Sequence, residues 1–180
     1  KGRGRTVFRG WGRRWCHRIV TPPLHIALLN PEIGPNTGNI GRLCLGIEAH
    51  LHLIHPLGFR IDDKAVRRAG LDYWKHVQLH EHDCVEDFWS WAGDRQVLLF
   101  STGGEQVYTE APYREDTVLL FGRETKGLPK EMIEEHGAWR IPMSGQIRSI
   151  NLANAVAVVA YQALQEIRPV IFGQHTLDGP

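Results

Sequence analysis

The chain has 180 residues, of which 42% are hydrophobic and 23% are charged, and its formal net charge is +1. These values are typical of one globular domain with a proper core and exclude a disordered chain. No stretch approaches the roughly 20 apolar residues that a membrane-spanning helix needs. The cysteines, Cys16, Cys44 and Cys84, are odd in number and far apart, which favours structural thiols in a reducing compartment.

Apolar runs and turn residues divide the chain into alternating strands and helices. Residues 34–38 are expected to form a loop. In chain order, the predicted elements are a strand at 25–29, a helix at 39–49, a strand at 51–55, a short basic helix at 64–68, a strand at 76–79, a helix at 85–91, strands at 97–101 and 118–121, a helix at 129–134, a strand at 139–141 and a helix at 151–166. This alternation predicts an α/β fold with a mainly parallel sheet flanked by helices.

Basic charge is concentrated at the start of the chain. Residues 1–23 hold seven of the 21 Lys and Arg residues and no acidic residue, which leaves 14 basic against 20 acidic residues, net −6, for 24–180. Such an arm is suited to phosphate, but a transit-peptide remnant or an added extension fits the same composition. We expect a basic extension at 1–23, one domain at 24–170 and a tail at 171–180.

The helix at 151–166 has almost no polar face, because its apolar side chains are separated mainly by alanines. A helix that is apolar nearly all round must be covered on more than one side. The sheet provides one cover, and a second copy of the chain is the expected other. We therefore predict a homodimer that uses this helix.

Three loops contain the residues suited to chemistry. The first, NTGNIGR (36–42), offers glycines and a helix N-terminus to an anion, with Arg42 in the following turn. The second, FGRETKGLP (121–129), follows a buried strand, where open α/β sheets bind ligands. It matches neither a Walker A motif nor a dinucleotide fingerprint. Each loop is also consistent with an ordinary connection or helix cap.

The third loop runs from Ile141 through a polar segment into the apolar helix. Ser149 or Asn151 can cap that helix, and the same side chains can also serve a ligand. Taken together, NTGNIGR, FGRETKGLP and IPMSGQIRSINLANAVAVVAYQAL resemble the three signature motifs of the SPOUT RNA methyltransferases. The resemblance is strongest to the TrmL/YibK group, and it extends over residues 25–167, including HPLGFRIDDKAVRRAGLDYW.

This resemblance implies a SPOUT fold with a C-terminal trefoil knot, which composition alone would not suggest because knots are very rare. It implies a homodimer through the knot and the helix at 151–166. It also implies S-adenosylmethionine as cofactor, S-adenosylhomocysteine as product, and no metal. The cofactor-binding positions carried over are Phe100, Ser101, Gly122, Glu124, Ile141, Met143, Ser149 and Leu152.

The implied reaction methylates a ribose 2′-hydroxyl of RNA. Arg42 matches the motif-one arginine, and we expect it to hold a phosphate or the developing oxyanion, because arginine stays charged. An RNA phosphate or a water then takes the proton. Ser149, Asn151 and Asn36 are candidates to orient the ribose. The RNA-binding candidates are Arg42, Lys64, Arg67, Arg68, Arg123, Lys126 and Arg148.

The TrmL-like group modifies nucleotide 34, a cytidine or a modified uridine, of leucine tRNAs, and we expect the same substrate here. Ribosomal RNA, another tRNA position, or non-catalytic RNA binding are the alternatives. The expected compartment is the cytoplasm, or an organelle if 1–23 is a transit-peptide remnant. Three residues depart from the group: Arg123 replaces a frequent proline, Lys126 replaces arginine, and Gly41 replaces a bulkier residue.

Two other patterns are expected to be structural. His80-Glu81-His82-Asp83-Cys84 resembles a metal cluster, but alternating residues in a short exposed stretch rarely converge on one ion. Trp89 and Trp91 are suited to stacking on bases, but edges of the core are the expected place for both.

Overall fold

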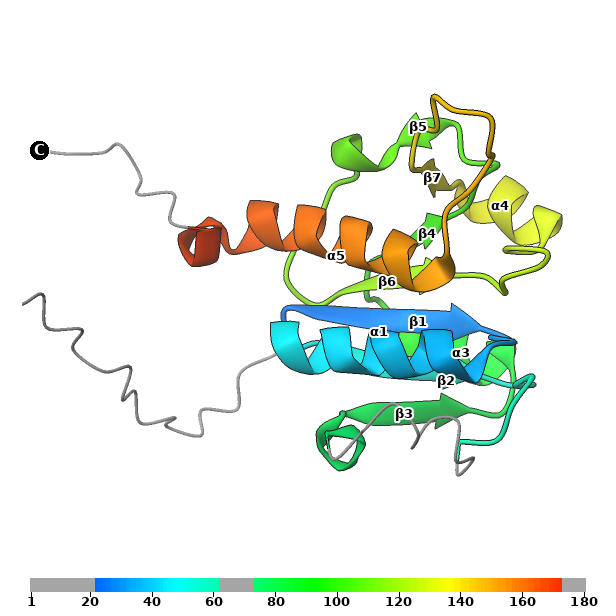
Figure 1. The fold of residues 1–180 in the computed structure, drawn as a ribbon, viewed down its shortest axis with the longest axis vertical. Coiled ribbons are helices and arrows are strands. Elements are labelled where there is room, and N and C mark those ends of the chain that lie inside the picture. Colours follow the sequence, from blue (N-terminus) through cyan, green and yellow to red (C-terminus); the bar gives the residue numbers. More distant parts are fainter. Residues whose placement is uncertain (1–21, 62–72, 173–180) are drawn as a thin grey trace, which may run out of the picture.

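The strand β1 (Leu24–Leu29) lies inside a seven-stranded sheet with the order β3-β2-β1-β6-β4-β7-β5. All of its pairings are parallel. The computed structural model describes residues 22–61 and 73–172 (Figure 1). The other strands are β2 (His50–Ile54), β3 (Leu79–His82), β4 (Val97–Phe100), β5 (Gln106–Val107), β6 (Thr117–Phe121) and β7 (Trp139–Arg140).

Helices cover both faces of this sheet. The helices α1 (Gly34–Ile47) and α5 (Leu152–Ile167) share one face (Figure 1), and α3 (Val85–Ala92) and α4 (Lys130–His136) pack on the other. Short 3₁₀ helices, η1 (Trp74–His76), η2 (Tyr108–Glu110) and η3 (Pro169–Phe172), complete the described structure. Three layers with a parallel sheet confirm the predicted fold class.

Alternation along the strands produces two cores. In β6, Leu119 and Phe121 face α1 and α5, whereas Val118 and Leu120 face α3 and α4. Side chains of a strand point to opposite faces in turn, so a strand buried on both sides reads as a continuous apolar run. The strands β1, β2, β4 and β6 were predicted to within one residue at each end for this reason.

Two predicted boundaries were wrong. The helix α1 begins at Gly34 rather than at residue 39, because Pro35 lies in its first turn, where proline is well tolerated. The strand predicted at 76–79 lies instead at Leu79–His82, where it pairs with β2. The short strand β5 was not predicted, because only its pairing with β7 defines it. The basic helix predicted at 64–68 lies outside the described residues.

Cys44 and the two tryptophans of α3 lie where the sequence predicted, in or beside the core, whereas Cys84 is half-buried and Cys16 lies outside the described residues. Cys44 is fully buried, and burial raises the pKa of its thiol to about 12. Trp89 and Trp91 pack partly buried against the core beneath α3. No helix in residues 22–61 and 73–172 is long and apolar enough to cross a membrane.

Five histidines gather on the α3 face of three adjacent strands, and we call them the histidine network. They are His25 of β1, His50 and His52 of β2, and His80 and His82 of β3. The ring of Trp91 packs against His25, His52 and His82, and its centroid lies 4.0 Å from that of His52. His80 and His82 therefore belong to a paired strand, not to the exposed stretch that was expected. Within the described ranges, no group of three metal-ligating side chains is arranged to hold an ion.

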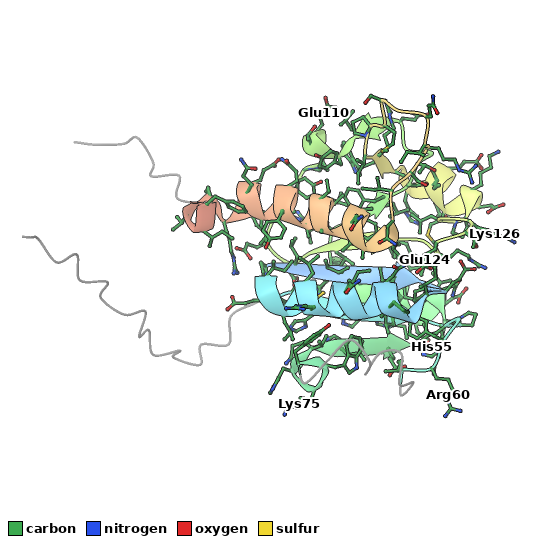
Figure 2. All side chains as sticks on the ribbon, viewed as in Figure 1. His55, Arg60, Lys75, Glu110, Glu124 and Lys126 are labelled. Atoms are coloured by element: carbon green, nitrogen blue, oxygen red, sulfur yellow. The ribbon has the colours of Figure 1, made fainter. Side chains whose placement is uncertain are left out.

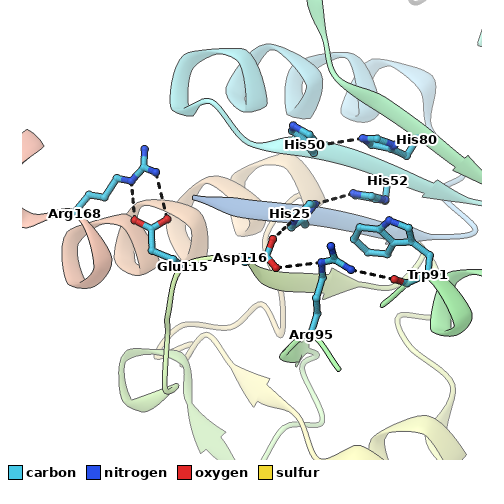
Figure 3. Close-up of polar contacts among 9 residues, drawn as sticks. All are labelled: His25, His50, His52, His80, Trp91, Arg95, Glu115, Asp116 and Arg168. Carbon is cyan, nitrogen blue, oxygen red and sulfur yellow. Dashed lines mark hydrogen bonds and ion pairs between the residues drawn. The ribbon is translucent and has the colours of Figure 1, made fainter. Parts of the chain in front are cut away.

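The hydrogen bonds of this network run in one direction. His25 Nε2 lies 2.9 Å from Asp116 Oδ1 (Figure 3), and since a carboxylate only accepts, Nε2 carries the hydrogen. His25 Nδ1 then accepts from His52 Nε2 at 2.9 Å, and His52 Nδ1 accepts from His82 Nε2 at 3.0 Å. Arg95 binds the other oxygen of Asp116 at 3.2 Å. These bonds give one tautomer each to neutral His25, His52 and His82, while His50 and His80 form a separate pair.

Burial favours the neutral form of the rings in this network. Burial, reinforced by the neighbouring histidines, lowers the pKa of His52 to about 2. Burial also lowers the pKa of His25, His50, His80 and His82.

The helix α5 buries one side and exposes apolar side chains on another. Val156, Val159 and Leu164 are buried against the sheet. Tyr161, in contrast, is 49% exposed, and the neighbouring Val170 of η3 is 81% exposed. The helix therefore leaves an apolar surface that its own chain does not cover.

Candidate functional site

A cavity of about 420 Å³ lies at the carboxyl ends of β4, β6 and β7, beside the start of α5. This volume is within the range of small-molecule sites. Its position is next to the point where the strand order reverses about β1, which is where open α/β sheets bind ligands. The cavity is bounded by three segments far apart in sequence, 100–102, 121–127 and 139–155, together with Ile33, just before α1, and Asn36 of the first loop.

The second loop is so tight that only glycine fits at its start. A Cβ on Gly122 would lie 2.1 Å from the carbonyl carbon of Gly127. The Gly127 N–H donates to Arg123 O at 2.8 Å, and Gly127 itself has a φ of 67°. The backbone is thereby folded back on itself, and the loop presents main-chain groups to the cavity at close range.

Glu124 of this loop holds the start of α1 (Figure 2). Its carboxylate accepts from the N–H groups of Glu32 at 2.8 Å and Ile33 at 3.3 Å, and from Asn36 Nδ2 at 2.9 Å. A carboxylate is favourable at a helix N-terminus because the unpaired N–H groups there carry partial positive charge. These three hydrogen bonds therefore hold the first and second loops together.

A second carboxylate joins the same two segments, but here the acceptor precedes α1 and the donor belongs to the second loop. Glu32 accepts from the Thr125 N–H at 3.0 Å and from its hydroxyl at 2.8 Å and 2.9 Å. The bond from the Thr125 hydroxyl lowers the pKa of Glu32.

Asn36 extends the connection to the third loop. Its Oδ1 accepts from Asn151 Nδ2 at 3.0 Å, while Asn151 Oδ1 accepts from the N–H of Ala153 at 2.9 Å and so caps α5. Asn36 is 7% exposed. Hydrogen bonds thus run from Glu124 through Asn36 and Asn151 to the start of α5, and they fix the three loops relative to one another.

The β4 side of the cavity also depends on a close backbone approach. The Ser101 N–H donates to Trp139 O at 2.9 Å. A Cβ on Gly104 would lie 2.6 Å from Ala138 O, so glycine allows the two segments to meet. The Arg140 guanidinium donates to the carbonyls of Gly104 and Glu105 and holds this turn.

The structure brings most of the predicted site residues to this one cavity. Lining it are Phe100, Ser101, Gly122, Glu124, Ile141, Met143, Ser149 and Leu152, all expected to bind the cofactor, and also Asn36, Asn151, Arg123, Lys126 and Arg148. Their roles remain predictions. Figure 2 shows Glu124 beside the helices and Lys126 at the periphery.

The remaining predicted residues do not line the cavity. Arg42 is exposed on α1, beside Tyr73. Lys64, Arg67 and Arg68 lie outside the described residues. Arg123, at the cavity, also donates to Asn30 Oδ1 at 3.3 Å, so part of its hydrogen-bonding capacity is used within the fold.

Sequence reasoning missed the connecting residues. Glu32 and Thr125 had no assigned role, and the hydrogen bonds of Glu124 to the start of α1 were not predicted; its role in cofactor binding stays a prediction. An acidic residue just before a helix was the available signal for Glu32, but its partner lies 93 residues away.

The cavity combines apolar walls with polar groups. Phe100, Phe121 and Leu152 provide apolar walls, while the loop at Gly122 is packed so closely on itself that a Cβ there would clash with the backbone of Gly127 and Leu128. An apolar cleft with a few fixed polar groups is typical of small-molecule and cofactor sites.

The chain matches the model of the SpoU rRNA Methylase family over residues 23–161. It is 44% identical to the tRNA (cytidine(34)-2'-O)-methyltransferase of Aeromonas hydrophila subsp. hydrophila over 147 residues, which cover 80% of this chain and 94% of that protein. It is 41% identical to the Escherichia coli K12 protein of the same name, again over 80% of this chain and 94% of the relative.

Solved structures show the same fold. One, described as "Structural insights into the 2-OH methylation of C/U34 on tRNA", is 43% identical, has a TM-score of 0.78, and is matched over 84% of this chain and 97% of its own. The AdoMet-bound rRNA methyltransferase from Sinorhizobium meliloti is 28% identical, with a TM-score of 0.72 over 82% of this chain and 59% of its own.

Proposed function

Because the chain belongs to the SpoU rRNA methylase family, we propose that it methylates the 2′-hydroxyl of nucleotide 34, a cytidine or modified uridine, in leucine tRNAs. Membership in the family confirms the resemblance inferred from the three loops. The relatives at 41% and 44% identity carry the name of this reaction. The observation that carries the proposal is the single cavity that the three loops form, with Gly122 at its tightest point.

S-adenosylmethionine, the proposed cofactor, supplies an electrophilic methyl group when it is bound and leaves as S-adenosylhomocysteine. We assign its binding to the residues at the strand ends, with Phe100, Gly122 and Ile141 around it and Leu152 closing the site. Asn36 and Asn151 hold the loops in place. Positioning of this kind removes several kcal/mol from a barrier because the reacting groups are already aligned.

On the RNA side, the ribose hydroxyl must lose its proton as its oxygen accepts the methyl group. A guanidinium is a cation that donates hydrogen bonds, so we assign Arg42 to an RNA phosphate or to the negative charge that develops on the oxygen. The proton passes to an RNA phosphate or to water. Ser149 is the proposed contact to the ribose, while Lys126 and Arg148 are proposed contacts to the RNA backbone.

We further propose that the active form is a homodimer, built on the knot that the family resemblance implies. The support is the apolar surface of α5 and η3, where Val158, Tyr161, Val170 and Ile171 are 38%, 49%, 81% and 62% exposed. A monomer in sedimentation at micromolar concentration would overturn this. The cytoplasm is the proposed compartment, with an organelle as the alternative if residues 1–23 are a transit-peptide remnant.

The experiment that tests the function is methylation of purified RNA with mapping of the product. The protein is incubated with S-adenosylmethionine and unmodified tRNA or ribosomal RNA, and the modified nucleotide is located by mass spectrometry. We expect a 2′-O-methyl group at position 34 of leucine tRNAs, formed much more slowly but still measurably by Arg42→Ala. Methylation of ribosomal RNA alone would support the second candidate, which the 28% identical rRNA methyltransferase favours. Absence of S-adenosylmethionine binding in calorimetry would indicate a non-catalytic RNA-binding protein.

A further inference from the structure

Arg42 is a long, exposed side chain, and its contact within the described residues is an aromatic ring. Its Cζ lies 5.8 Å from the centroid of the Tyr73 ring. Among the same residues, no carboxylate forms an ion pair with it. A guanidinium within about 6 Å of a ring face is attracted by the ring's electrons. The Tyr73 ring is therefore the feature of the fold that restricts where the Arg42 charge can lie.

Tyr73 is itself fixed to the helix that carries Arg42. Its hydroxyl donates to Gly38 O at 3.1 Å. Gly38 lies four residues before Arg42, on the same side of α1. The ring thus spans one helical turn, with its hydroxyl anchored at one end and the guanidinium over its face at the other. Burial raises the pKa of Tyr73, so the hydroxyl stays protonated and able to donate.

The residue after Tyr73 provides a second anchor. Trp74 fills the space above Gly41, where a Cβ would lie 2.4 Å from its Cζ3 atom. The turn is closed by hydrogen bonds from His76 N to Tyr73 O at 2.8 Å and from Val77 N to Trp74 O at 3.0 Å. The missing side chain at Gly41 therefore lets this turn dock directly against the segment of α1 that ends in Arg42.

We propose that Tyr73 is the positioning residue for Arg42, and this inference rests on the proposed methyl transfer. The ring limits the guanidinium to a small set of conformations beside α1, so less rotamer freedom is lost when Arg42 meets the RNA. Tyr73 acts through Arg42 and touches neither cofactor nor reacting atoms. Its removal should slow turnover without weakening cofactor binding.

The test is a double-mutant cycle on the full chain, with methyl transfer to tRNA as the activity. Tyr73→Leu should lower kcat by roughly threefold to tenfold and leave the Kd for S-adenosylmethionine unchanged. Tyr73→Phe keeps the ring and should retain most of the activity. In the Arg42→Ala background, Tyr73→Leu should cause no further loss, because the residue through which it acts is gone. Equal losses in both backgrounds would overturn the proposal.

A second pair of variants separates the ring's charge distribution from its shape. Tyr73→Phe is compared with pentafluorophenylalanine at the same position, which has a similar shape but an electron-poor face. Turnover should be lower for the fluorinated ring, and only while Arg42 is present. Identical turnover for the two rings would overturn the proposal even if Tyr73→Leu fails to fold. Wild-type protein that methylates no RNA would instead overturn the proposed function.

Discussion

The cavity and the histidine network are both polar regions of this sheet, and they differ in how their side chains are partnered. In the network, ring nitrogens bond to one another and the chain ends on Asp116 beside Arg95. At the cavity, Glu124 and Asn36 bond across loops. Within residues 22–61 and 73–172, the side chains of Arg148 and Ser149 at the cavity make no hydrogen bond or ion pair.

This difference separates groups that maintain the fold from groups that are available to a ligand. Buried polar side chains bonded only to one another add structure and leave nothing for chemistry. Polar side chains that are unpaired beside a fixed framework retain their capacity for a substrate. The comparison therefore predicts that changes at the cavity affect binding most, while changes in the network affect stability and its pH dependence.

The largest effect is expected for Gly122→Ala. The new Cβ would lie 2.1 Å from the Gly127 carbonyl carbon, so the loop must move and the cavity is distorted. Overpacking costs of about 1–3 kcal/mol correspond to S-adenosylmethionine binding that is roughly 5- to 150-fold weaker in calorimetry. Gly145→Ala is the matched control, because a Cβ there meets nothing within 4 Å. Equal affinity of the two variants for S-adenosylmethionine would contradict the prediction that changes at the cavity affect binding most.

The next effect tests the framework around the cavity. Glu124→Ala removes the acceptor of three hydrogen bonds at the start of α1. The free energy of unfolding should fall by about 1–3 kcal/mol in urea titration, with weaker cofactor binding as well. Glu105→Ala, which removes an exposed carboxylate, should leave both values within about 0.5 kcal/mol. Unchanged cofactor affinity in Glu124→Ala would show that the hydrogen bonds of Glu124 to the start of α1 do not shape the cavity.

The histidine network should make the fold sensitive to mild acid. The pKa of His52 is lowered in the folded state, so both states are neutral above pH 6.5 and the full stability is present there. Below pH 6.5 the unfolded chain takes up a proton that the folded chain excludes, which costs about 1.4 kcal/mol per pH unit. His52→Asn should therefore be less stable at pH 7.5, yet lose less stability than wild type between pH 6.5 and 5. If the free energy of unfolding, measured by denaturant titration, fell equally with pH in wild type and His52→Asn, this assignment would be contradicted.

The smallest effect concerns salt. Lys126 lies on the rim of the cavity, where a phosphate contact would release a counterion. Lys126→Gln should reduce the slope of log affinity for tRNA against log salt by about one. Arg114→Gln, an exposed charge before β6 at the opposite end of the sheet, should leave the slope unchanged. Flat tRNA affinity between low and physiological salt in wild type would refute the RNA assignment altogether.

The sequence allowed the elements to be predicted where burial dictates the pattern. The strand β6 and the helix α5 have apolar spacing that only a buried position explains, and both were placed within about one residue. The start of α1 was missed because the glycines and Asn36 suggested a loop, while Pro35 initiates the helix. Tertiary pairing with β2, rather than local pattern, decided where β3 lies.

The sequence predicted which residues line the site, but not the hydrogen bonds that join its loops. The three loops were recognised from their residues, and the structure places them around one cavity. The bonds from Glu124 to Asn36 and onward to Asn151 join positions 88 and 115 residues apart, so no local spacing signals them. The contact of Tyr73 with Arg42 depends on a turn that docks where Gly41 lacks a side chain.

A crystal structure of the protein with S-adenosylhomocysteine tests the central claim most directly. We expect the ligand between the ends of β4, β6 and β7, against the backbone at Gly122 and Ile141, with Leu152 closing over it. A ligand bound elsewhere, with this cavity still empty at saturating concentration, would contradict the assignment of the three loops to one methyl donor.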